Sequence, residues 1–148
     1  MSDNTVTVQI SPHQGYQFNN HFGDQVPDLR TDEPPPLGTG TGPDPTQLLA
    51  SAVGNCLAAS LQFSLAKYKQ DAGGISARVQ AEVGRNADKR LRVLSMDVRL
   101  TLGVPGAGIE HLDRVLAAFE DFCTVTGSIR AAIAVQVKVF DSSGAQLK

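Results

Sequence analysis

The sequence contains little of several residue types on which common protein classes depend. Its 148 residues include no tryptophan, two cysteines and three histidines. Two cysteines are too few for the disulfide framework of a small secreted domain. They lie 67 positions apart without a second pair, and the histidines show no ligand spacing, so no metal site is expected.

The sequence motifs that bind nucleotides or carry hydrolytic nucleophiles are also missing. No Gly-x-Gly-x-x-Gly or Walker loop is present, and the glycine-rich stretch 38–42 lacks the lysine that a Walker loop requires. No Gly-x-Ser-x-Gly elbow occurs either. The adjacent carboxylates at 32–33 and 120–121 are typical of solvated surface. The sequence therefore predicts no cofactor.

The charge balance excludes two classes of partner. Thirteen lysines and arginines against fifteen acidic residues give a net charge of −2, which argues against nucleic-acid binding and polybasic membrane docking. The N-terminus lacks the basic and apolar regions of a secretory signal. Residues 46–66 carry no charge but several polar side chains, which favours a helix buried in protein over a membrane span. We expect a cytoplasmic protein, whose thiols stay reduced unless they are working.

The length and the periodicity predict one α+β domain over residues 1–148. Alternating apolar residues indicate strands, and apolar residues at helical spacing indicate helices. The predicted elements are a β-hairpin over 5–19, a third strand within 22–30, a long helix from 45 to about 70, a second hairpin from 75–83 and 91–102, a helix over 109–122 and a strand over 131–140.

A Pro/Gly-rich loop over about residues 31–45 precedes the long helix. Its three consecutive prolines, 34–36, exclude a helix or a central strand. A loop this long inside a compact domain is often functional, and a flexible linker is the alternative. Asp44 and Pro45 then supply an N-cap and a first helical residue. The helix is apolar around most of its circumference and about 38 Å long, which favours a dimer that shares it.

The two cysteines allow two interpretations. Cys56 lies on an apolar face of the long helix, and Cys123 directly follows the second helix. Both could be small buried hydrophobic residues. Alternatively, one thiolate attacks a peroxide oxygen and becomes a sulfenic acid, which the other thiol converts to a disulfide. The attacking thiol then needs a nearby positive charge, for which arginine is suited because it never deprotonates.

Two segments resemble the signatures of the OsmC/Ohr family of osmotically inducible and organic hydroperoxide resistance proteins. Residues 42–56, GPDPTQLLASAVGNC, are similar to the loop and helix that lead to the first cysteine of this family. Residues 123–129, CTVTGSI, are similar to the segment at its second cysteine. The resemblance covers roughly residues 5–140, and residues 31–34 are most similar to the OsmC-like branch.

The resemblance implies an α+β fold of antiparallel sheets with a long buried central helix. It also implies a cofactor-free peroxidase in an intertwined homodimer with its sites at the subunit interface. Cys56 would be the peroxidatic thiol and Cys123 the resolving thiol. An N-terminal arginine would pair with the first, with Arg30 the first candidate and Arg130 the second. The substrate would be a bulky organic hydroperoxide, and dithiols such as lipoylated proteins would be the reductant.

One position departs from the family pattern. The acidic residue that fixes the arginine is expected about ten positions before the first cysteine, where this chain has Thr46 followed by Gln47. Neither side chain forms an ion pair. Asp44, or Asp32 and Glu33 in the loop, are the available substitutes.

Three functional hypotheses follow. The first is a hydroperoxide reductase whose apolar pocket includes Phe22, Leu57 and Phe122. The second is a small-molecule binding domain of the same fold with weak or no peroxidase activity, which Thr46 favours. The third is a protein with two inert, buried cysteines.

Overall fold

The computed structural model describes residues 2–148, which form two compact units. The first unit runs up to Leu48, and the second covers Leu49–Lys148. Each unit has a three-stranded sheet of its own. The single domain expected over residues 1–148 stays a prediction.

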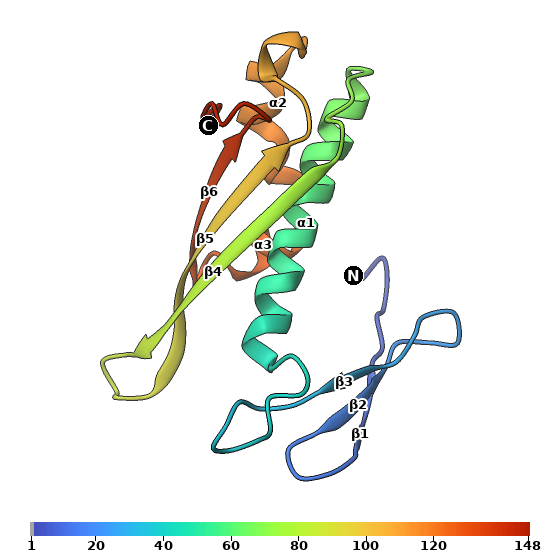
Figure 1. The fold of residues 1–148 in the computed structure, drawn as a ribbon, viewed down its shortest axis with the longest axis vertical. Coiled ribbons are helices and arrows are strands. Elements are labelled where there is room, and N and C mark those ends of the chain that lie inside the picture. Colours follow the sequence, from blue (N-terminus) through green and yellow to red (C-terminus); the bar gives the residue numbers. More distant parts are fainter. Residues whose placement is uncertain (1) are drawn as a thin grey trace. The chain divides into compact units, whose positions relative to one another are not determined.

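The first unit contains three short antiparallel strands in the order β1-β2-β3 (Figure 1). They are β1 (Gln9–Pro12), β2 (Phe18–His21) and β3 (Leu29–Thr31). The expected hairpin and third strand are present, but β1 begins four residues later than predicted. Pro12 is the last residue of β1. β1 is an edge strand, where a missing backbone donor is tolerated.

The loop after β3 folds around a buried carboxylate. Asp32 is 2% exposed and accepts hydrogen bonds from the hydroxyls and backbone N–H groups of Thr39 and Thr41. A Cβ at Gly38 would lie 2.4 Å from an Asp32 carboxylate oxygen, so this close approach requires glycine. The interpretation of Asp32 as solvated surface is therefore wrong. The hydrogen bond from Thr39, more than any other contact, holds the pKa of Asp32 well below its ordinary value.

Helix α1 (Pro45–Lys67) begins at a reciprocal cap. The backbone N–H of Gln47 donates to the Asp44 carboxylate at 2.7 Å, and that of Asp44 donates to the Gln47 side chain at 3.0 Å. This capping box confirms the predicted start. The helix ends three residues before the predicted end, because Lys69 adopts a left-handed conformation with φ of 56°.

The sheet of the second unit has the order β4-β5-β6 (Figure 1). β4 (Ile75–Arg85) and β5 (Leu91–Leu102) form the predicted antiparallel hairpin. β6 (Ala134–Phe140) runs parallel to β5, so the expectation of antiparallel sheets is wrong for this pair. α1 packs closely on one face of this sheet. A Cβ at Gly54 would lie 2.8 Å from Cγ2 of Val79, so glycine sets the closeness of helix and strand.

The parallel pair β5 and β6 requires a crossover connection, which the chain builds from short helices. The prediction of one helix over 109–122 is wrong, and the helix that follows it was missed. His111 adopts φ of 59°, so α2 begins only after it. The segments are η1 (Gly106–Gly108), α2 (Leu112–Ala118), η2 (Phe119–Phe122) and α3 (Thr124–Ile129).

The core of the second unit lies between α1, the sheet and the crossover. Val53, Leu57, Leu61 and Leu65 repeat every four residues along α1 and are fully buried. Each such side chain contributes about 1.5–3 kcal/mol by leaving water. By length and composition α1 could also cross a membrane, but core helices of soluble proteins pass the same test. Its buried face identifies it as a core helix.

Candidate functional site

Cys56 opens onto a shallow apolar depression in the second unit. Its side chain is half-buried, and Ala59, Ser60 and Phe63 lie on the same face of α1 at helical spacing. Phe122, at the end of η2, completes the lining. The volume of the depression is about 370 Å³. It is large enough for an apolar group of a small substrate to lie beside the sulfur.

Two aromatic rings and one cation form the rim of this depression. Phe63 and Phe122 meet edge to face with ring centroids 6.1 Å apart, and each is about half exposed. The ammonium of Lys67 lies 4.7 Å from the first ring and 4.3 Å from the second. These apolar surfaces remain open to solvent in the isolated chain.

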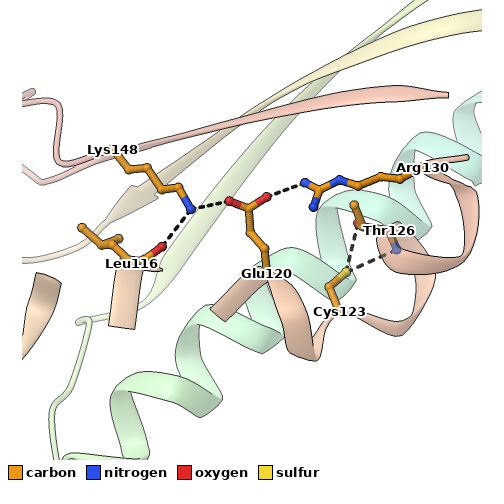
Figure 2. Close-up of polar contacts among 6 residues, drawn as sticks. All are labelled: Leu116, Glu120, Cys123, Thr126, Arg130 and Lys148. Carbon is orange, nitrogen blue, oxygen red and sulfur yellow. Dashed lines mark hydrogen bonds and ion pairs between the residues drawn. The ribbon is translucent and has the colours of Figure 1, made fainter. Parts of the chain in front are cut away.

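Cys123 is buried, at 2% exposure, and is the N-cap residue of helix α3. Its Sγ donates to Oγ1 of Thr126 at 3.0 Å and accepts from the backbone N–H of Thr126 at 3.4 Å (Figure 2). Burial raises the pKa of the Cys123 thiol, and the neighbouring Cys56 thiol adds to the rise, whereas the contacts with Thr126 oppose it. The fold thus brings two thiols that are distant in sequence into interaction.

A charged network fixes the chain on both sides of Cys123. Figure 2 shows Glu120 between Arg130 and Lys148, and the lysine also donates to the carbonyl of Leu116 at 2.8 Å. The Glu120 side chain is only 15% exposed, so its interpretation as solvated surface is wrong. Burial acts to raise the pKa of Glu120, but the two cations outweigh it and the pKa is lowered. The network joins η2 before the cysteine to the end of α3 after it.

The other expected site residues do not line the depression beside Cys56. Arg30 is an exposed residue of β3, and Phe22 follows β2 with 40% exposure, so both belong to the first unit. The pairing of Arg30 with Cys56 and the place of Phe22 in the substrate pocket stay predictions. Leu57 has no exposed surface and packs in the core rather than lining the depression. The second unit therefore brings together Cys56, Cys123 and Phe122.

Two of the three substitutes considered for the missing acidic residue, Asp44 and Asp32, have carboxylates that are already engaged. The Asp44 carboxylate caps α1 through Gln47, and the Asp32 carboxylate is surrounded by donors of its own loop. Glu33 is half-buried, and its backbone N–H donates to Asp32. Between residues 2 and 148, no group of three or more potential metal ligands occurs.

Three features of the site were not predicted from the sequence. The spacing of Cys123 and Thr126 is that of a helix N-cap and its third residue, which is a local signal. Phe63 lies two helical turns after Cys56 and hence on the same face. No local signal connects Lys148 to Glu120, because this contact depends on the return of the chain's end to the crossover.

A family model described as OsmC-like protein matches residues 38–138. A search of curated proteins found no significant match.

Solved structures share the fold at low sequence identity. An OsmC-like protein from Mycoplasma pneumoniae matches with a TM-score of 0.79 and 14% identity, over 95% of this chain and 99% of that one. An organic hydroperoxide resistance protein OsmC from Legionella pneumophila matches with a TM-score of 0.70 and 18% identity, over 94% of this chain and 98% of that one. A protein from Vibrio cholerae matches with a TM-score of 0.74 and 18% identity, over 99% of both chains. It is described as related to organic hydroperoxide resistance, and it has captopril bound in one of its active sites.

The family model covers most of the chain and includes both cysteines, and the α+β fold is that of the solved relatives. The chain belongs to the OsmC-like protein family.

Proposed function

We propose that this protein is a cytoplasmic thiol peroxidase that reduces organic hydroperoxides in defence against oxidative stress. One observation carries the proposal: the Cys56 thiol borders an apolar depression and lies near enough to Cys123, 67 positions away in the sequence, to help raise the pKa of that thiol. Membership of the family, whose solved relatives include organic hydroperoxide resistance proteins, supports the same class of reaction.

The reaction proceeds in three balanced steps. The Cys56 thiolate attacks the outer oxygen of the hydroperoxide, the O–O bond breaks, and the alcohol leaves after taking up a proton while Cys56 becomes a sulfenic acid. The Cys123 sulfur then attacks the Cys56 sulfur, which forms the disulfide and releases water. An external dithiol, such as a lipoylated protein, reduces the disulfide and is itself oxidised.

The different surroundings of the thiols support their assigned roles. Cys56 is half-buried and borders the depression, where a peroxide can reach it. Cys123 is buried and its raised pKa keeps it protonated, which suits a thiol that acts only after its neighbour is oxidised. Phe63 and Phe122 would contact the apolar part of the substrate.

An arginine is needed to stabilise the Cys56 thiolate and the departing oxygen. Arg30 is exposed and forms no ion pair within 4 Å among the described residues, so it is free for this role. Arg130 is engaged by Glu120 and is the second candidate. We propose that Arg30, of the same chain or of a partner, pairs with Cys56.

The exposed stripe of α1 supports a homodimer. Ala52, Ala59 and Ala66 are exposed, Cys56 is half-buried, and Phe63 is 54% exposed, all along one side of the helix. Small and apolar residues in one helical stripe are typical of close helix packing. A second copy of α1 would cover this stripe and enclose the depression beside Cys56, which would complete an apolar substrate pocket.

A small-molecule binding domain with weak or no peroxidase activity is the second candidate. Thr46 and Gln47 supply no carboxylate to fix an arginine, and Asp44 is engaged in the cap of α1. The relative from Vibrio cholerae holds captopril in one active site, which supports a binding role for this fold. Turnover separates the two candidates.

The test is steady-state consumption of cumene hydroperoxide with dihydrolipoamide as reductant. The wild type should turn over, Cys56→Ser should consume no peroxide, and Cys123→Ser should consume one equivalent and then over-oxidise. The two serine variants are matched controls for each other. Binding of the peroxide without turnover in the wild type would refute the peroxidase and leave the binding domain.

A further inference from the structure

The sheet of the second unit carries a row of positive charges on the face opposite α1. In the strand register, Arg78 of β4 pairs with Arg99 of β5, and Arg99 pairs with Lys138 of β6. All three side chains are exposed, and they alternate with Val79 and Val98, which face α1 and the core. Like charges directly opposite one another destabilise a sheet, so this row has an energetic cost in the isolated protein.

No protein group neutralises the row. The acid on the neighbouring row of the same face is Asp97, which pairs in register with Gln80 and Gln136. Among residues 2–148, none of the ion pairs or side-chain hydrogen bonds in the structure involves the three cations or Asp97. The residues that line this part of the face therefore include three cations and a single carboxylate.

The row lies in a groove with the dimensions of a small-molecule site. Its volume is about 520 Å³, within the usual range of ligand pockets, and it is lined by the cations, by two glutamines and by Phe140. The Arg99 guanidinium lies 3.8 Å from the centroid of the Phe140 ring, a stacking contact that orients it. Neighbouring strands are about 4.8 Å apart, so the outer cations are separated by about 10 Å at their backbones.

We propose that this groove binds a small linear polyphosphate group, such as the diphosphate or triphosphate of a small molecule. The three cations lie side by side across the strands, and their long, flexible side chains can converge on the successive negative charges of a phosphate chain. Two arginine forks match phosphate oxygens in a bidentate geometry, and Gln80 and Gln136 offer amide donors beside them. The groove is separate from the cysteines, so binding does not depend on peroxidase activity.

The test is calorimetric titration of the full chain with inorganic triphosphate, pyrophosphate and phosphate, at low ionic strength without divalent ions. Affinity should fall in that order, because shorter anions reach fewer cations. Arg78→Gln and Lys138→Gln should each weaken triphosphate binding roughly tenfold, the effect of one charged hydrogen bond. Asp97→Asn should tighten it, since it removes the one negative charge of the groove.

Arg92→Gln is the matched control, because it removes an exposed arginine of the same sheet outside the row. It should leave the affinity unchanged, as should Cys56→Ser. Thermal unfolding with and without triphosphate shows that each variant is folded, and the ligand should raise the melting temperature of the wild type more than that of Arg78→Gln. Absence of triphosphate binding, equal affinity for phosphate and triphosphate, equal weakening by Arg92→Gln, or no gain in Asp97→Asn would overturn the proposal.

Discussion

Replacing Gly54 with alanine tests whether this glycine sets the distance between α1 and the sheet beside Cys56. A Cβ at this position would lie 2.8 Å from Cγ2 of Val79, whereas carbon atoms prefer about 3.5–4.0 Å. Overpacking of this kind costs about 1–3 kcal/mol. Alanine also improves helix propensity by about 1 kcal/mol. The free energy of unfolding should therefore fall by about 0–2 kcal/mol.

A double-mutant cycle separates the clash from the helix propensity. Val79→Ala removes the methyl group that a Cβ at Gly54 would meet, so the double variant should be about 1–3 kcal/mol more stable than the sum of the single effects predicts. Urea unfolding of the four proteins gives this coupling energy.

Gly127→Ala is the matched control for this cycle. Gly127 lies in α3, and no atom lies within 4 Å of the Cβ that alanine would add. This substitution should raise the free energy of unfolding by up to about 1 kcal/mol. Equal stabilisation by Gly54→Ala and Gly127→Ala, with a coupling energy near zero, would refute the close-packing argument.

Three further predictions concern titratable groups of the second unit. The hydrogen bond from the backbone N–H of Gly106, more than any other contact, lowers the pKa of Asp141 to about 2. The ionised Asp141 therefore stabilises the fold above about pH 4, and this contribution is lost as the pH falls through 2. In acid-unfolding curves, the difference in free energy of unfolding between wild type and Asp141→Asn should shrink over that interval. In a Cys56→Ser background, Thr126→Val should raise the pKa of Cys123, measured as alkylation rate against pH, because it removes a hydroxyl that lowers it. Glu120→Gln should lower the free energy of unfolding by about 1–2 kcal/mol in urea at neutral pH, since it weakens two charged hydrogen bonds.

Local patterns predicted the elements whose structure is determined locally. The alternation of apolar residues gave the β4–β5 hairpin, and the Asp44-Pro45 pair gave the start of α1. The helix expected over 109–122 was wrong because its apolar spacing continues through His111, where the backbone turns left-handed. The bounds of α2, η2 and α3 are set by how these segments pack on α1 and the sheet. The apolar spacing within the segment carries no information about that packing.

The sequence predicted which residues belong to the candidate site, but not how the fold arranges them in space. The cysteines were identified from their own segments, but the interaction of Cys56 with Cys123 depends on the crossover between β5 and β6. Asp32 was expected in solvent because its donors, Thr39 and Thr41, lie in a loop whose path sequence does not specify. The pairing of Arg30 with Cys56 stays a prediction.

The most direct test of the thiol pair is the intact mass and free-thiol count of reduced protein after one equivalent of cumene hydroperoxide, with hydrogen peroxide in parallel. Both Cys56 and Cys123 are free thiols in the structure. A working thiol pair should lose both thiols rapidly, with a mass decrease of two hydrogens per chain, and should do so faster with the organic peroxide. An unchanged mass and two free thiols after minutes would contradict it.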